Sequence, residues 1–392
     1  MNKILLILLF LITFNQNSFS QLYKYQVLVG ISGRVDTTYN EDVKDIYHLF
    51  KNYLESRPDS FYNNPYWTKF DKYGKDSGCI SIFYKGFYSL HTAPKKLFQQ
   101  WKPYILTIDK NNNTKYLLRV ALVQDSVSDL DKFLTILQVN AIKEDGRWVL
   151  QNTYSDIVES WTTRKEGFIK YIYPPSYQFN DVLAKKSVRF CDSIASLLQI
   201  NRFDSFTFLI TDKVDNMGLL FGYEFFYQNY TTGMTDPYMN RIYSAKGNEF
   251  YPHEFVHMIL KGNIKGDLNY ILQEGLSCFL GELNTEKYDN WFYYLADDYL
   301  KNKPTYTLHH LLTNTAEYNG YSTAYSTGCV LIEVLYDRKG INGLIQLINT
   351  KKANTEDEIY ATFKSLTGFN EKELERAFKE KLIQKTNYPT KK

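Results

Sequence analysis

The chain has 392 residues, of which 44% are hydrophobic and 23% are charged, a composition that excludes both a disordered and a collagen-like protein. The 46 Lys and Arg residues against 43 Asp and Glu residues give a formal net charge of +3, which excludes a nucleic-acid partner bound through bulk positive charge. A length of this order allows two domains of ordinary size or one large domain.

The first twenty residues have the pattern of a secretory signal peptide. A positively charged start precedes an apolar run at residues 4–14, and Ser18 and Ser20 place small residues where a signal peptidase cleaves. We expect residues 1–20 to be removed and the mature chain to begin at Gln21, in the periplasm or outside the cell. The alternative is an uncleaved anchor, although the run is short for a bilayer span. No later segment has eighteen uninterrupted apolar residues, so we expect no stable membrane insertion after cleavage.

The four cysteines are spread over the chain without a Cys-x-x-Cys pair: Cys79, Cys191, Cys278 and Cys329. This spacing argues against a cysteine-based zinc site and against a dense disulfide framework. In an oxidising compartment it leaves room for one or two disulfides, whose pairing the spacing does not specify.

Residues 21–158 are predicted to form an N-terminal domain of mixed helix and strand. The apolar spacing between Glu41 and Glu55 predicts an amphipathic helix. Strand-like stretches follow at residues 79–83, 104–108, 116–123, 134–142 and 148–154, with hairpin turns at 111–113 and 145–146. A helix followed by long antiparallel strands is weakly similar to the cone fold of the nuclear-transport-factor-2-like proteins. This domain carries no group of residues typical of catalysis.

A polar, turn-prone segment at residues 159–166 predicts the domain boundary, and residues 165–385 are predicted to form the second domain. Its expected elements are a helix at 181–198, a buried strand at 206–211, a short strand at 241–244 and closing helices at 356–366 and 371–382. Together the two domains predict an α+β fold class.

The segment His253-Glu254-Phe255-Val256-His257 is an HExxH motif. Two histidines four residues apart lie on one face of a helix, so both rings can reach one zinc ion. Glu254 lies beside them, where its carboxylate can take a proton from a water activated by the metal. The alternative is a pair of ordinary helix histidines next to a solvated glutamate.

A third ligand is expected shortly after the motif. Gly262 and Gly266 supply a loop that turns the chain back, so that Glu274, on a predicted second helix, can face the two histidines. Three protein ligands and an open fourth position are typical of catalytic zinc. Two other acids remain as alternatives: Glu282, about two turns further along the helix, and Asp267, within the loop.

These residues resemble those of the gluzincin metallopeptidases. The segments HEFVH and QEGLSCFLGE are similar to the thermolysin-like superfamily, in which the third ligand begins a Glu-Gly helix. The segment from Tyr325 to Cys329 resembles the Tyr-x-x-Gly-small helix of the aminopeptidase-N-like branch, whose tyrosine donates a hydrogen bond to the oxyanion. The resemblance implies a thermolysin-like domain with an edge-strand sheet and a mainly helical C-terminal half. It implies that His253, His257 and Glu274 are zinc ligands, that Glu254 is the general base and that Tyr325 is the oxyanion donor. The alternative for Tyr325 is a buried aromatic residue on a packed helix, and Tyr321 is the second candidate for the oxyanion donor.

The chain also departs from this family. Only sixteen residues, 258–273, separate His257 from Glu274, which is tighter than usual. The exopeptidase signature Gly-x-Met-Glu-Asn is absent, and the nearest segment, Gly233-Met234-Thr235-Asp236, lacks its glutamate. Whether the chain is an endopeptidase or an exopeptidase therefore stays open. Residues 240–244 are expected to form the edge strand that pairs with an extended peptide.

The function that these patterns predict is a secreted zinc metallopeptidase acting on a peptide or protein. Of the adjacent His309 and His310, at most one could contribute to a site, because neighbours on a helix point in different directions. One alternative is a degenerate relative that binds zinc and serves as a binding or scaffold module at the cell surface. The other is a cell-surface protein without metal, in which the HExxH motif is fortuitous.

Overall fold

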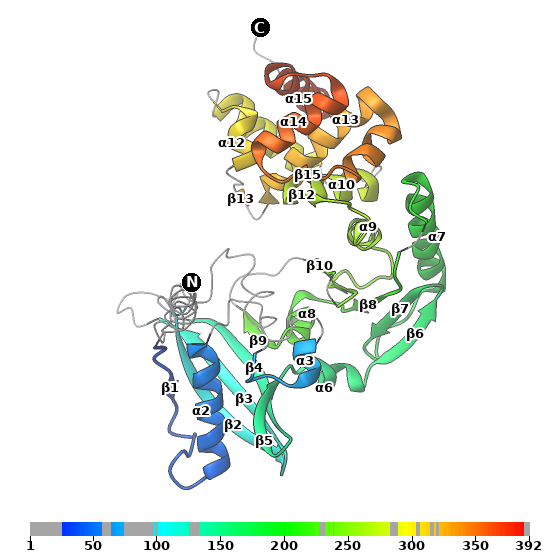
Figure 1. Cartoon of the computed structure of the whole chain (residues 1–392). Helices are drawn as coiled ribbons and strands as arrows, with labels where there is room; N and C mark the ends of the chain where they lie inside the picture. The colour runs from blue at the N-terminus through cyan, green and yellow to red at the C-terminus, as the bar shows by residue number, and fades with distance from the viewer. Residues whose placement is uncertain are drawn as a thin grey trace, which may run out of the picture. The chain divides into compact units, whose positions relative to one another are not determined.

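The computed structural model describes residues 26–56, 64–73, 98, 101–124, 133–201, 203–226, 232–237, 239–282, 289–302, 306–313, 317–318 and 321–387. The expected signal peptide and the expected strand at 79–83 lie outside these residues. The chain is α+β, as expected, and divides into two compact units, Met1–Ser160 with Val214–Thr231 and Trp161–Lys213 with Thr232–Lys392 (Figure 1). Among the described helices, none is both long enough and apolar enough to cross a membrane.

The first unit is a helix packed on a largely antiparallel sheet. Its elements are β1 (Gly30–Ile31), α2 (Glu41–Glu55), α3 (Lys69–Tyr73), β2 (Lys102–Asn112), β3 (Lys115–Val123), β4 (Phe133–Glu144), β5 (Arg147–Gln151) and α6 (Tyr154–Glu159). The strands follow the order β1-β2-β3-β4-β5, and only β1 and β2 are parallel. Asn40 caps α2 by accepting a hydrogen bond from the Val43 backbone. The helix expected at 41–55 is confirmed.

The strands of the first unit mostly agree with the expected ones. Those expected at 104–108, 116–123 and 134–142 lie inside β2, β3 and β4. The last expected strand is too long, because β5 ends at Gln151 and the chain enters α6 at Tyr154. The turn at Asp145 and Gly146 is confirmed: both residues have positive φ, as a tight two-residue hairpin requires.

A later segment of the chain completes the first unit. Helix α8 (Val214–Leu220) leads into β9 (Tyr223–Phe226), which pairs antiparallel with β4. Within this pair of strands and β3, Glu224 accepts hydrogen bonds from Arg119 Nε at 2.6 Å and from Gln138 Nε2 at 3.0 Å. The segment lies inside the range 165–385 expected for the second domain, but Val214–Thr231 belongs to the first unit.

The second unit contains a five-stranded sheet. Its elements are β6 (Thr162–Glu166), β7 (Ile169–Tyr173), α7 (Asp181–Leu197), β8 (Phe206–Ile210), β10 (Gly233–Asp236) and β11 (Arg241–Ser244), and the strand order is β10-β11-β8-β7-β6. The boundary expected at 159–166 agrees with the division between Ser160 and Trp161, but Thr162–Glu166 forms a strand that pairs with β7 and not a turn. Polar and charged residues there belong to an exposed edge strand, where such residues discourage further pairing.

The expected edge strand is also wrong. The strand at 241–244 exists as β11, but it lies between β8, to which it is parallel, and β10, to which it is antiparallel. In the described part of the chain, the edge strand on this side of the sheet is therefore β10, and β6 is the edge strand on the other side. Alternation along a sequence predicts that a strand forms but not which neighbours it has. A short strand containing glycine and aspartate has weak β propensity, so β10 gave no signal of its own.

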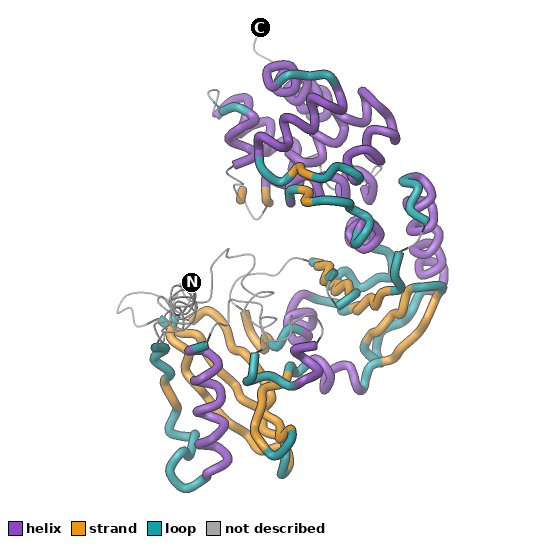
Figure 2. The backbone as a smooth tube through the Cα atoms, in the orientation of Figure 1, coloured by secondary structure: helices purple, strands orange, loops and turns teal. Residues whose placement is uncertain are grey.

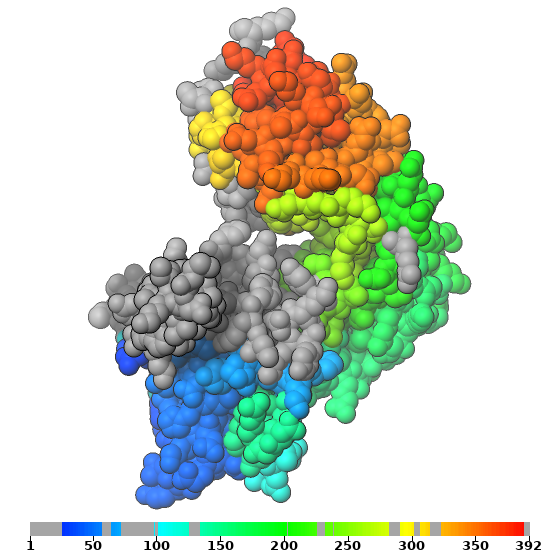
Figure 3. Space-filling model, in the orientation of Figure 1, coloured from blue at the N-terminus to red at the C-terminus, as the bar shows by residue number. Residues whose placement is uncertain are grey.

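The remainder of the second unit is mainly helical (Figure 2). Its helices are α9 (Pro252–Leu260), α10 (Tyr270–Glu282), α11 (Asp289–Ala296), the π-helix η3 (Asp297–Asn302), α12 (Leu308–Thr313), α13 (Thr323–Ile348), α14 (Glu356–Thr367) and α15 (Glu371–Thr386). Two small sheets join β12 (Asp267–Leu268) to β15 (Lys352–Ala353) and β13 (Glu317–Tyr318) to β14 (Tyr321–Ser322). The closing helices expected at 356–366 and 371–382 are confirmed, and α13 to α15 pack together as one block, orange to red in Figure 3.

Candidate metal centre

Helix α9 carries the HExxH motif and is fixed by its apolar side. Pro252 begins the helix at a position where its missing N–H would have no partner. Phe255 is fully buried and packs edge-to-face against Phe208 of β8, with ring centroids 5.4 Å apart. This packing holds one face of α9 on the sheet. The histidines, four residues apart, share the face that points away from it.

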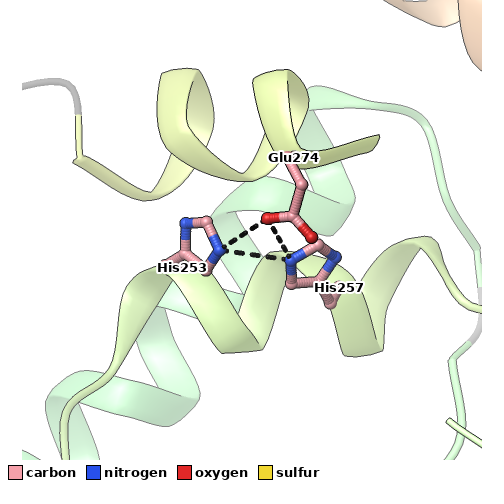
Figure 4. Close-up of side chains that lie close together, drawn as sticks. All are labelled: His253, His257 and Glu274. Atoms are coloured by element: carbon pink, nitrogen blue, oxygen red, sulfur yellow. Dashed lines mark hydrogen bonds and ion pairs between the residues drawn. The ribbon is translucent and has the colours of Figure 1, made fainter. Parts of the chain in front are cut away.

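The structure brings His253, His257 and Glu274 together (Figure 4). The two Nε2 atoms are 3.2 Å apart, and Glu274 Oε2 lies 3.1 Å from His253 Nε2 and 3.3 Å from His257 Nε2. Ligand atoms at the usual 2.0–2.1 Å from a tetrahedral zinc ion are about 3.3 Å from one another. The three side chains could therefore hold a metal ion, and their separations and donor types fit zinc.

Glu274 reaches this position because α10 crosses α9 at close range. The loop expected after α9 is present, and Gly262 in it has φ of +70°, a conformation that side chains disfavour. Further along α10, a Cβ atom on Gly281 would lie 2.8 Å from the backbone of His253. The backbones of the two helices therefore touch, which leaves only a short gap between Glu274 and the histidines.

A second close crossing places Tyr325 beside the same centre. Gly275 of α10 faces Gly328 of α13, and a Cβ atom on Gly328 would lie 2.9 Å from the Gly275 backbone. Tyr325 lies one turn before Gly328, and its ring centroid is 5.7 Å from that of His253. The two glycines of the predicted Glu-Gly and Tyr-x-x-Gly helices thus let α10 and α13 approach each other.

The phenol of Tyr325 is held by other aromatic residues. Tyr270 donates a hydrogen bond to its oxygen over 3.4 Å, and the ring of Trp291 packs edge-on against it at 5.3 Å. Burial, followed by the negative charge of Glu274, raises the pKa of Tyr325 well above its ordinary value. The phenol therefore stays protonated at physiological pH and can donate a hydrogen bond.

The ligands also perturb one another. Burial lowers the pKa of His257, but the charge of Glu274 and a hydrogen bond to it outweigh this effect and raise that pKa to about 8. Burial raises the pKa of Glu274, but the neighbouring His257 and His253 lower it to about 2. In the protein without metal, these groups therefore form a buried ion pair near neutral pH.

Two residues at the centre were not predicted. Thr235 of β10 donates a hydrogen bond over 2.6 Å to Oε2 of Glu254, which is itself buried. The thiol of Cys278 lies 3.8 Å from Nδ1 of His253, the ring nitrogen that does not face Glu274. Cys278 could have been found from the sequence, because it lies one helical turn after Glu274 on the same predicted helix. Thr235 belongs to the segment Gly233-Met234-Thr235-Asp236, which stood out in the sequence only because it lacks the glutamate of the exopeptidase signature.

The other candidates lie away from the centre. Asp267 is exposed and accepts a hydrogen bond from Asn354. His309 is paired with Glu356, and Nδ1 of His310 accepts a hydrogen bond from the Thr307 backbone. The side chains of two further candidates, Glu282 and Tyr321, lie outside the described residues, although their backbones belong to α10 and β14. Within the part of the chain that the structure describes, one cluster alone has metal-ligand geometry.

The cysteines show no pairing in the described chain. Cys191, Cys278 and Cys329 are buried, and no disulfide joins them, whereas Cys79 lies outside the described residues.

Comparison with known proteins identifies no family for the chain: no protein-family model matches it, and no curated protein matches it. The likeness to the gluzincins therefore depends on the motifs quoted above.

Proposed function

We propose that the chain is an exported zinc-dependent metallopeptidase of the gluzincin type, acting on a peptide or protein substrate. The observation that carries the proposal is the arrangement of three buried or half-buried donor atoms at separations of 3.1–3.3 Å. Glu254 follows directly after His253, the first ligand. Tyr325 lies beside His253 and has a proton to donate. These are the parts that hydrolysis of a peptide bond requires.

Each residue has a defined role in the proposed reaction. His253, His257 and Glu274 would hold the metal. A zinc ion in such a site supplies a Lewis acid and makes water a nucleophile at neutral pH. Glu254 accepts the proton of the attacking water and passes it to the departing amine. Tyr325 donates a hydrogen bond to the oxyanion that develops on the substrate carbonyl.

The finer architecture is part of the same proposal. A thermolysin-like second unit is supported by a sheet whose edge strand, β10, is antiparallel to its neighbour, followed by the helices that carry the ligands. A nuclear-transport-factor-2-like first unit is supported by α2 and the long antiparallel strands β2 to β4. Export is supported by the pattern of the first twenty residues alone.

Metal content and cleavage test the proposal together. Residues 21–392 should bind about one zinc ion per chain, and the His257→Ala variant should bind none under the same conditions. The purified chain should cleave an unfolded protein such as casein, and Glu254→Gln should remove that activity while zinc stays bound. Zinc binding without cleavage by the unaltered chain would favour the scaffold alternative. Absence of bound or recruited zinc would reject the metal centre itself.

A further inference from the structure

Thr235 contacts the group that the proposed reaction uses as its base. We propose that Thr235 is a positioning residue, which orients the carboxylate of Glu254 for proton transfer through the hydrogen bond between Thr235 Oγ1 and Glu254 Oε2. This inference rests on the proposed peptidase function. It assigns a role to the edge strand β10 beyond closing the sheet.

The backbone around Thr235 is fixed from both sides. Gly233, two residues earlier on the same face of β10, lies so close to the ring of Tyr251 that a Cβ atom there would overlap it. At the end of the strand, Asp236 accepts a hydrogen bond from the Met239 backbone over 3.2 Å, which holds the turn towards β11. Thr235 therefore presents its hydroxyl to α9 from a defined position.

The hydroxyl constrains a side chain that would otherwise rotate. The terminal torsion of a glutamate is broad and has no strong preference of its own. Thr235 Oγ1 lies 2.6 Å from Oε2 of Glu254 and 3.3 Å from its backbone oxygen, so the short contact to the carboxylate takes the hydroxyl proton. An O–H···O hydrogen bond of this length lies at the short end of the range found in proteins.

This arrangement divides the work between the two carboxylate oxygens. A threonine hydroxyl has one proton to donate, and that proton is directed at Oε2. Oε1 is left to accept the proton of the attacking water. Because proton transfer needs the acceptor within hydrogen-bond reach, a carboxylate that rotates freely would spend less time in the productive orientation.

The experiment compares three variants with a reference, which is the unaltered chain of residues 21–392. Thr235→Val keeps the shape and removes the hydroxyl, and Thr235→Ser keeps the hydroxyl. Thr232→Val is the matched control, because the Thr232 hydroxyl lies 3.4 Å from that of Tyr251 and not on Glu254. For each chain we would measure zinc content, kcat and KM on one quenched fluorescent peptide, and unfolding in urea.

The expected result is a selective loss of turnover. Thr235→Val should lower kcat by about 10- to 100-fold, with KM and zinc content within about twofold of the unaltered chain. Thr235→Ser and Thr232→Val should stay close to the unaltered chain. If the role of Thr235 were only structural, Thr235→Val would change KM or zinc content together with kcat, and the effect would not be confined to kcat. Unchanged kcat in Thr235→Val, loss of its zinc, or no rescue by serine would overturn the inference.

A stability measurement tests the contact without using activity. Thr235→Val should lower the urea midpoint of the otherwise unaltered chain but not that of a Glu254→Ala chain, in which the acceptor is gone. If Thr235→Val lowered the urea midpoint equally in the unaltered chain and in the Glu254→Ala chain, the inferred hydrogen bond between Thr235 and Glu254 would be wrong. Failure of the peptidase proposal is distinguishable, because it shows in the unaltered chain as missing zinc or missing cleavage.

Discussion

Two groups of helices in the second unit are held in place by different means. Around the metal centre, α9, α10 and α13 are positioned by backbone approaches between residues far apart in the sequence. Gly281 faces the backbone of His253, and Gly275 faces Gly328. The side chain of the N-cap residue, Tyr251, makes no capping hydrogen bond to the first turn of α9. The geometry of the centre is therefore a property of the crossings between helices.

The closing helices α14 and α15 are defined locally instead. Each begins with a capping box, formed by Thr355 with Glu358 in α14 and by Asn370 with Glu373 in α15. Gly368 ends α14 in the left-handed conformation that favours glycine. The difference teaches that a change at the crossings should affect metal binding and stability together, whereas a change at a cap should affect stability alone.

The largest effect is expected where two backbones touch. In Gly328→Ala the added Cβ would overlap the carbonyl oxygen of Ile271 and lie 2.9 Å from Gly275. Neither backbone can rotate away as a side chain does, so α10 must shift against α13. We expect a loss of roughly 3 kcal/mol in the free energy of unfolding and zinc binding at least about tenfold weaker, measured by urea unfolding and zinc titration.

A glycine in open surroundings provides the control for this change. A Cβ atom on Gly33 would have no heavy atom within 4 Å, so Gly33→Ala should change the free energy of unfolding by no more than about 0.5 kcal/mol. If Gly328→Ala unfolded at the same urea concentration as the unaltered chain and bound zinc equally well, the crossing would not be what positions Glu274.

The second effect concerns pH and is confined to the metal centre. The pKa of His257, about 8 without metal, is above its ordinary value. The charged pair therefore stabilises the metal-free fold fully below pH about 6.5 and loses this contribution as the pH rises to about 8. The pKa of Glu274 is lowered to about 2, so the contribution of Glu274 to stability is lost only as the pH falls from about 4.5 towards 2. We expect about 2 kcal/mol less stability at pH 9 than at pH 6 from this pair.

Zinc should reverse that trend. A metal binds the neutral imidazole, so zinc affinity should rise with pH up to about 8 as His257 loses its proton. Urea unfolding in EDTA and zinc titrations between pH 5 and 9 measure the two opposite slopes. His257→Ala should flatten the first slope, and His309→Ala, which changes an exposed histidine paired with Glu356, should leave it unchanged. A metal-free chain equally stable at pH 6 and 9 would contradict the ion pair.

The same contrast explains what could be predicted from the sequence. The helix at 41–55, the two closing helices and the turn at 145–146 were predicted well, because apolar spacing, caps and turn residues are local signals. The clustering of His253, His257 and Glu274 was predicted because the helical period fixes the first two and a short loop limits the third. These predictions needed no knowledge of strand pairing.

The errors fall where pairing between distant segments decides the structure. The strand at 241–244 was predicted, but its place inside the sheet depends on β10, whose four residues have no strand signal. The strand β9 joins a sheet formed by residues about ninety positions earlier, which no local pattern indicates. Thr235 was missed for the same reason, since its hydroxyl reaches Glu254 only because β10 is the edge strand.

The smallest effect is expected at the cap of α14. Thr355→Ala removes the hydroxyl that accepts a hydrogen bond from the Glu358 backbone and should lower the free energy of unfolding by about 1 kcal/mol. Zinc affinity should be unchanged, because the cap touches none of the three ligands. Thr355→Ser, which keeps the acceptor, should restore most of the stability. If Thr355→Ala also weakened zinc binding, the closing helices and the crossings would act as one unit, and the contrast drawn between them would be wrong.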